Sequence, residues 1–178
     1  MRPGSWDARV MEVRRATVDD IDVMAHVLAT VAEEGTLGTE PPVDLEVRGQ
    51  RFRELIEGQG PSAMWVLEDG GRVLGNASVS ETRTSGVLTL GMAILAEARG
   101  RGGGRRLLEA ILEHARSQGA HKVELEAWTD NARAIALYVS TGFEVEGLRR
   151  NHYRRRDGSL RSTLLMAVLL DTSEPEPA

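Results

Sequence analysis

The stretch from Leu90 to Arg106, LGMAILAEARGRGGGRR, contains an apolar strand, a glycine-rich turn and the beginning of a helix. The helix continues to Ser117 with leucine, isoleucine and alanine on one face, and Gly119 ends it. At a helix start the backbone N–H groups lack partners, the helix dipole is positive, and glycine lets an anion approach closely. The stretch therefore predicts a phosphate-binding turn, to which Arg101 and Arg105 add positive charge.

Two other phosphate-binding motifs require different residues at this turn. A P-loop requires Lys followed by Ser or Thr after the last glycine, and Arg105 and Arg106 stand there instead. A dinucleotide fingerprint requires G-x-G-x-x-G, a spacing that Gly100 to Gly104 does not keep. A plain structural turn remains open from these residues alone.

Hydrophobic periodicity and turn residues predict a single α/β domain over residues 11–170. We expect a mixed, mostly antiparallel sheet of six to seven strands with helices on its faces. Expected strands cover residues 12–16, 63–68, 72–81, 87–94, 123–128, 143–149 and 162–169. Further helices are expected after Thr17, from Leu45 to Gly58, and after Asn131, with a proline-containing loop over residues 36–43.

Composition excludes several classes of function. The net charge of −5 argues against general nucleic-acid binding, and the absence of cysteine removes disulfides, thiolate metal sites and a cysteine nucleophile. The histidines lack the spacing of metal ligands, so we expect no metal. No apolar run is long enough for a membrane helix, which favours a cytoplasmic protein without a membrane partner. Residues 1–10 are expected to be a flexible leader, with Met11 an alternative start, and residues 171–178 a disordered tail.

Three segments together resemble the GNAT acetyltransferases. Arg99 to Gly104 matches the R/Q-x-x-G-x-G/A motif of that family, and Asp130 to Glu144 resembles its Asn-capped helix with a Tyr and a Gly-Phe end. Arg149 to Leu169 is similar to the end of the ribosomal-protein alanine and amino-acid N-acetyltransferases. The resemblance implies a sheet with splayed central strands, acetyl-CoA as cofactor, and direct acetyl transfer to a primary amine in a ternary complex.

The resemblance also assigns the cofactor site. The backbone next to the turn pairs with the pantetheine, the turn holds the pyrophosphate, and the helix N-cap contacts the cofactor arm. The residues implied are Met92, Ala93, Ile94, Arg99, Gly100, Arg101, Gly102, Gly103, Gly104, Arg105, Asn131 and Tyr138.

Two side chains are the catalytic candidates. Tyr138 corresponds to the general acid of the family, which protonates the departing sulfur. Glu126 corresponds to the catalytic glutamate of the ribosomal-protein alanine acetyltransferases, and strand alternation places it opposite Leu125 and Ala127. A salt bridge at a solvated sheet edge is the alternative for Glu126, and a water chain the alternative base.

The acceptor side is less well specified by the sequence. Glu33, Glu34 and Thr36 suggest an acidic mouth for a cationic amine, and Asn151 and Tyr153 match polar positions of the family's last hairpin. The acceptor stays open between an amino acid, another small amine and a peptide N-terminus. A homodimer is implied by resemblance only, and a non-catalytic acyl-CoA-binding sensor or partner module is the alternative function.

Overall fold

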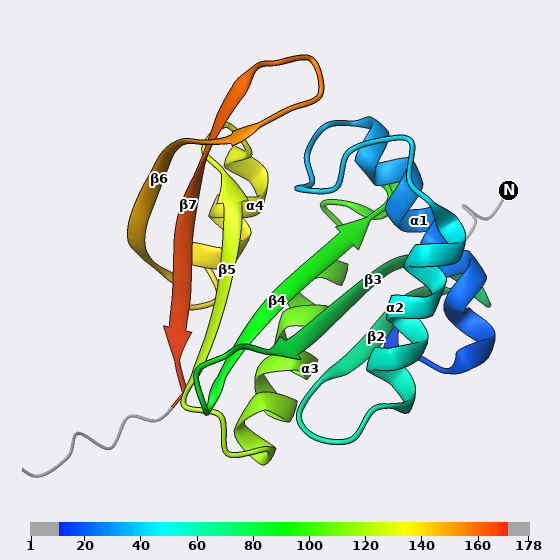
Figure 1. Cartoon of the computed structure of the whole chain (residues 1–178). Helices are drawn as coiled ribbons and strands as arrows, with labels where there is room; N and C mark the ends of the chain where they lie inside the picture. Colours follow the sequence, from blue (N-terminus) through cyan, green and yellow to red (C-terminus); the bar gives the residue numbers. More distant parts are fainter. Residues whose placement is uncertain (1–10, 171–178) are drawn as a thin grey trace, which may run out of the picture.

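The computed structural model describes residues 11–170, and within them seven strands form one sheet in the order β1-β2-β3-β4-β5-β7-β6. All neighbouring strands are antiparallel except β4 and β5 (Figure 1). The strands are β1 Glu12–Arg15, β2 Ala63–Asp69, β3 Arg72–Glu81, β4 Val87–Ile94, β5 Lys122–Trp128, β6 Glu144–Arg154 and β7 Leu160–Leu169. This confirms the predicted fold class, while the expected leader and tail lie outside the described residues.

The helices form two layers on opposite faces of the sheet. Helices α1 (Ile21–Glu33) and α2 (Leu45–Glu57) cover one face, and α3 (Gly103–Ser117) lies behind the strands in Figure 1, with α4 (Ala132–Val139) packing on the same core as α3. The apolar stripe of α3 is fully buried against β2, β3 and β5, which stabilises the domain by about 1.5–3 kcal/mol for each large side chain. The order of elements agrees with the sequence prediction.

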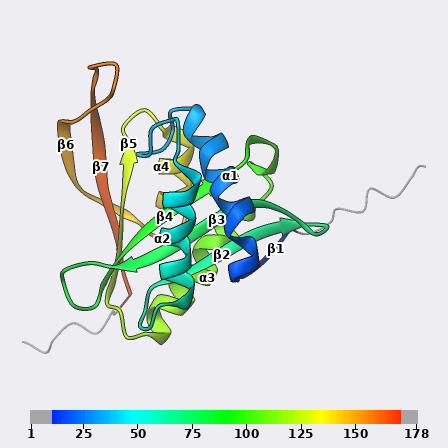
Figure 2. The ribbon, with the colours of Figure 1, turned by 45° about the vertical axis from the view of Figure 1, so that its right-hand side comes forward.

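The pairing between β4 and β5 stops part-way along both strands. Their register runs only from Val87 opposite Lys122 to Thr89 opposite Glu124. Beyond that point β4 pairs with β3 alone and β5 with β7 alone. The sheet therefore divides into two halves that diverge toward the carboxyl ends of β4 and β5, as two views show (Figure 1 and Figure 2).

The beginning of α1 is fixed by a buried carboxylate. Asp20 is 6% exposed, accepts hydrogen bonds from both terminal nitrogens of Arg14 at 2.7 and 2.8 Å, and closes a capping box with Thr17. The guanidinium of Arg14 lowers the pKa of Asp20 to about 2. The helix expected after Thr17 is present, although a 3-10 turn, η1 (Val18–Asp20), precedes it.

Strand β6 is longer than the sequence indicated. It was expected to end at Arg149, but pairing with β7 resumes at Tyr153 opposite Arg161 after an irregular register. Asn151 lies inside this irregularity with φ 51°, a left-handed conformation that asparagine tolerates better than most residues. A bulge of this kind is invisible to a simple alternation of apolar and polar residues.

Candidate active site

The glycines of the turn serve two different purposes. Gly100 and Gly102 have φ of 73° and 84°, in the left-handed region that side chains disfavour. Gly103 and Gly104 have ordinary φ, but a Cβ on them would lie 2.5 Å from Leu67 Cδ2 and 2.8 Å from Leu137 Cδ2 respectively. The first pair therefore gives the turn its shape, and the second pair lets the helix start pack closely on the sheet and on α4.

This shape leaves a row of backbone donors unused. Arg106 N donates to Gly102 O at 3.2 Å, but the N–H groups of Gly100 to Arg105 donate to no acceptor within the described chain. They stand at the positive end of the α3 dipole, the arrangement that binds phosphate groups. The predicted phosphate turn thus has the required backbone geometry.

The arginines of the turn make contacts that the sequence could not show. Arg99 Nε donates to Ile94 O at 2.8 Å, and Arg99 Nη1 lies 2.6 Å from a carboxylate oxygen of Glu34. Arg101 pairs with Asp69 at 2.8 Å. Arg105 bonds only the hydroxyl and carbonyl of Ser140, so its positive charge is not neutralised by a carboxylate among residues 11–170.

The splay exposes one edge of β4. Leu95 N donates to Leu74 O at 2.9 Å, so by strand alternation the backbone groups of Ala93 also face β3. The backbone groups of Met92 and Ile94 consequently face the gap. There the Ile94 carbonyl already accepts a hydrogen bond from Arg99 Nε. Of the three residues expected to pair with pantetheine, Ala93 therefore has no free backbone group on that edge.

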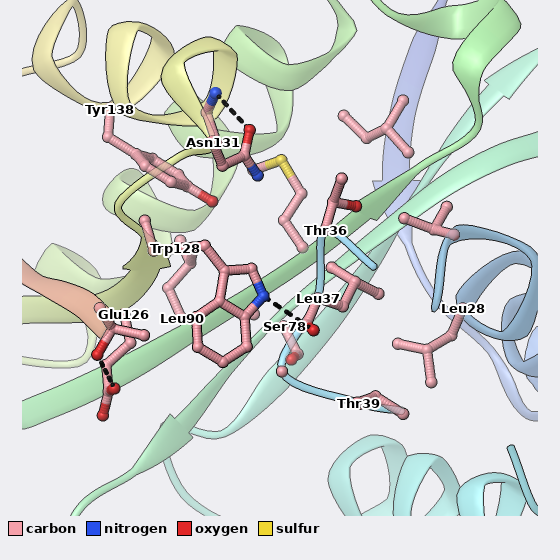
Figure 3. A pocket seen from close by; sticks show the side chains of 18 of the residues that line it. Leu28, Thr36, Leu37, Thr39, Ser78, Leu90, Glu126, Trp128, Asn131 and Tyr138 are labelled. Atoms are coloured by element: carbon pink, nitrogen blue, oxygen red, sulfur yellow. Dashed lines mark hydrogen bonds between the residues drawn. The ribbon is translucent and has the colours of Figure 1, made fainter. Parts of the chain in front are cut away.

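A cavity of about 680 Å³ occupies the splay and is lined from both faces of the sheet (Figure 3). On what we term the α2 side, α1 and α2 contribute Leu28, Val31, Arg48, Arg51 and Phe52, and the strands contribute Ser78, Thr89 and Gly91. On what we term the turn side, Arg99, Asn131, Arg133, Ala134, Leu137 and Tyr138 line it. Two ligands can therefore meet inside the sheet, one from each face.

Tyr138 brings a phenol to this junction. The residue is only 9% exposed and packs against Phe143, with 5.7 Å between ring centroids. Its hydroxyl points into the cavity and bonds no group of the described chain (Figure 3). Burial raises the pKa of Tyr138 to about 12, so the phenol stays protonated at neutral pH.

Asn131 stands beside Tyr138 in the cavity wall. It caps α4, with its side-chain oxygen accepting from Ala134 N at 3.2 Å. The structural role expected for an N-cap is therefore present together with exposure to the cavity.

Glu126 also lines the cavity and accepts three hydrogen bonds. Arg149 donates to Oε1 at 2.8 Å, and the hydroxyls of Tyr153 and Thr163 each donate to Oε2 at 2.8 Å. Thr163 is buried, and the Glu126 side chain keeps 30% of its surface exposed. The carboxylate is thus held in place by its neighbours. The salt bridge expected as the alternative role of Glu126 is present, with Arg149, and Glu126 nevertheless lines the cavity.

A clasp between the β6–β7 hairpin and the loop after α1 closes the α2 side. Arg161 donates to Gly35 O at 2.7 Å, and Arg156 to Pro41 O at 2.7 Å. Arg155 forms an ion pair with Glu40 at 2.9 Å. Trp128 Nε1 donates to the Leu37 carbonyl at 3.0 Å, with the Arg161 guanidinium 4.4 Å from its ring centroid. These arginines of the hairpin therefore fix the loop after α1.

The expected acceptor residues are only partly brought together. Thr36 and Tyr153 line the cavity, whereas Glu33 and Asn151 are exposed and do not line it, and Glu34 is paired with Arg99. The charged lining consists of four arginines and one glutamate, not the acidic mouth that the sequence suggested. Lining residues that carried no functional signal in the sequence include Arg48, Arg51, Phe52, Ser78, Thr89, Gly91, Trp128 and Arg133.

Over residues 11–170, histidines and acids form no group that could hold a metal ion. Likewise, no helix in this part of the chain is both long and apolar enough to cross a membrane.

Solved structures with the same fold are numerous. A ribosomal-protein-alanine N-acetyltransferase from Brucella melitensis is 29% identical, with a TM-score of 0.81 over 89% of this chain and 99% of that one. A phosphinothricin acetyltransferase from Sinorhizobium meliloti, in complex with acetyl-CoA, is 22% identical, with a TM-score of 0.82 over 95% and 94%. A GNAT acetyltransferase from Streptococcus pneumoniae is 18% identical, with a TM-score of 0.78 over 90% and 99%.

No curated protein matches the chain. The model of the acetyltransferase (GNAT) family matches residues 29–143, a segment that includes the glycine turn, Glu126 and Tyr138. With the splayed sheet, the free N–H groups and the matched segment in agreement, this chain belongs to the GNAT family of acetyltransferases, enzymes that take their acetyl group from acetyl-CoA.

Proposed function

We propose that this chain transfers the acetyl group of acetyl-CoA directly to a primary amine, with both substrates bound at once. The observation that supports this proposal best is the cavity that crosses the sheet between β4 and β5. On one face it reaches Arg99, the residue that begins the glycine turn, and on the other it opens into a separate, helix-covered space. Without cysteine in the chain, a Cys-acyl intermediate is excluded, so direct attack is the simpler route.

The residues of the turn side fit acetyl-CoA. The N–H groups of Gly100 to Arg105 would hold the pyrophosphate, and the Met92 and Ile94 N–H groups would pair with the pantetheine as an added strand does. When bound, acetyl-CoA supplies an acyl group on a thiol that leaves readily. A backbone N–H on the free edge of β4 is then placed to polarise the carbonyl oxygen.

Tyr138 is the proposed general acid. The phenol of Tyr138 keeps its proton at neutral pH because burial of the side chain raises its pKa to about 12. The hydroxyl bonds no other group of the described chain, so it is available to donate to the sulfur that departs. Asn131 orders the first turn of the helix that carries Tyr138, because its side chain caps that helix.

Glu126 is the proposed base. An alkyl amine has a pKa of about 10.4, so most of it carries an extra proton at pH 7 and cannot attack. The fixed carboxylate attracts the ammonium form and accepts its proton, directly or through the Tyr153 hydroxyl that bonds Oε2 and lines the cavity. In each cycle the ammonium nitrogen loses two protons. Glu126 takes the first and passes it to solvent, and the second, lost as the amide forms, replaces the proton that Tyr138 gives to the departing sulfur.

The proposal also covers the class of amine that is acetylated. We propose an amino acid, another small amine or a peptide N-terminus, and the Brucella enzyme, whose name gives a protein alanine as acceptor, supports the last of these. A cytoplasmic location and a homodimer complete the proposal.

The test is thiol release from acetyl-CoA across a panel of amines, amino acids and peptides. We expect at least one acceptor to turn over, and Glu126→Gln to lower its rate while the Kd for acetyl-CoA, measured by calorimetry, stays unchanged. Tight acetyl-CoA binding without turnover of any acceptor would favour the non-catalytic sensor, and absence of acetyl-CoA binding would refute both.

A further inference from the structure

The cavity wall carries more positive than negative side chains. Its charged lining is four arginines and one glutamate. Arg99 pairs with Glu34, and Glu126 pairs with Arg149 through Oε1 while Oε2 accepts only from hydroxyl groups. The charges left without an opposite partner in residues 11–170 are therefore all positive.

Two of these cations stand together on α2. Arg48 and Arg51 are three residues apart, so they project from the same face of the helix. Arg48 is half-buried, donates one long hydrogen bond of 3.3 Å to Thr39 Oγ1, and lies 6.0 Å from the Phe52 ring centroid. Its pKa is lowered, first by burial and second by the positive charge of Arg51. Neither Arg48 nor Arg51 forms an ion pair with a carboxylate of residues 11–170.

The position of the pair assigns it to the acceptor. Helix α2 covers the face of the sheet opposite α3, whose first turn carries the free N–H groups (Figure 1). The strand residues that line the cavity on this face, Ser78, Thr89 and Gly91, are small. A ligand whose phosphates lie on the turn side is thus separated from Arg48 and Arg51 by the sheet itself.

We propose that the acceptor is a small amino acid-like molecule, in which an oxyanion held by Arg48 and Arg51 accompanies the amine that is acetylated. The inference rests on the function proposed above and narrows its acceptor. Guanidinium groups bind carboxylates and phosphorus oxyanions in pairs of parallel hydrogen bonds. With the oxyanion on α2 and the ammonium drawn to Glu126, such a molecule is oriented at both ends, whereas a simple polyamine is repelled.

The experiment compares matched acceptors that differ only in the anion: 2-amino acids, their carboxamides and the corresponding 1-aminophosphonic acids. Each is measured with the wild-type protein and with Arg48→Gln, Arg51→Gln and Arg53→Gln. Arg53 is the control, because it lies on the same helix, pairs with Glu57 and does not line the cavity. We expect acids to exceed amides in kcat/KM, and Arg48→Gln or Arg51→Gln to reduce this preference about tenfold to a hundredfold. The phosphonates show which oxyanion fits.

Amides that react as well as acids, or a preference that survives loss of both arginines, would overturn the inference. It would also fail if these variants weakened acetyl-CoA binding as much as they weakened the acceptor. If no amine is acetylated, the proposed function fails first. Binding of the acids and amides in the presence of CoA, followed by calorimetry, then decides the oxyanion site independently, since binding needs no turnover.

Discussion

On the turn side the groups that are free to bind a ligand are backbone N–H groups from one continuous stretch, Gly100 to Arg105. On the α2 side they are side chains from separate elements, among them Arg48 of α2, Ser78 of β3 and Tyr153 of β6. A site made of backbone depends on glycine spacing and on a helix start. A site made of side chains depends on which elements the sheet brings together, so the two sides should respond differently to mutation.

The largest expected effect lies where the two sides meet. Tyr138→Phe removes only a hydroxyl that bonds nothing else in the described chain, so neither fold nor cofactor site should change. We expect kcat to fall about a hundredfold or more, the usual contribution of a general acid, with the acetyl-CoA Kd unchanged. Steady-state kinetics and calorimetry measure both quantities. If Tyr138→Phe keeps the wild-type kcat, water and not Tyr138 protonates the sulfur.

The next prediction fills the acceptor space on the α2 side and leaves the turn side unchanged. Gly91 lies on the α2 side with an ordinary φ, and a Cβ there would meet only Ser78 Oγ, at 3.5 Å. A leucine should therefore fold normally but occupy the acceptor space, and we expect KM for the amine to rise on the order of fiftyfold. The Kd for acetyl-CoA should stay constant.

Gly147→Leu is the matched control for this substitution. Gly147 is also a strand glycine with a single distant neighbour, Leu165 Cδ1 at 3.7 Å, but it lies outside the cavity lining. Equal changes in both variants would show that the effect comes from sheet packing and not from the acceptor space.

The same contrast explains what the sequence could predict. The glycine turn, its helix and the Asn131-to-Tyr138 spacing are local, so residues 88–144 are readable before the chain is folded. The fold class and the order of elements followed from periodicity in the same way. Each of these predictions depends on interactions between residues that are close together in the sequence.

Contacts between distant segments were not predictable. Glu34 appeared to belong to an acidic mouth, yet it pairs with Arg99, 65 positions away. Arg48 and Arg51 are ordinary helix arginines in the sequence, and only the crossing of α2 over the sheet places them at the cavity. A lone basic residue on a helix gives no signal of which face will be covered.

A smaller effect tests whether the layer of α1 and α2 can lose stability without harm to the cofactor site. Because the folded pKa of Asp20 is about 2, below its ordinary 3.8, its contribution to the free energy of unfolding is complete above pH 4 and is lost as pH falls toward 2. We expect Asp20→Asn to lower that free energy by about 2 kcal/mol at pH 7, with the difference vanishing near pH 2.

Denaturant titrations from pH 2 to 7 measure this, with Asp22→Asn as control because Asp22 is exposed in the same helix. Acetyl-CoA affinity at pH 7 should not change in either variant. A pH-independent loss of stability would contradict the assigned role of the Asp20 carboxylate, since the hydrogen-bonding shape would then matter and the charge would not.

The smallest effect concerns the turn itself. Gly102 has φ 84° and open space around its Cβ position, so alanine there costs only backbone strain of about 1–2 kcal/mol. If the chain relieves this strain by rotating the turn, the N–H groups move, and we expect the acetyl-CoA Kd to rise about tenfold. Gly119→Ala carries the same strain, with φ 71° and an equally open Cβ, at the other end of α3. Equal losses of stability with weaker cofactor binding only in Gly102→Ala would show that the backbone conformation of the turn, and not helix stability, holds the cofactor.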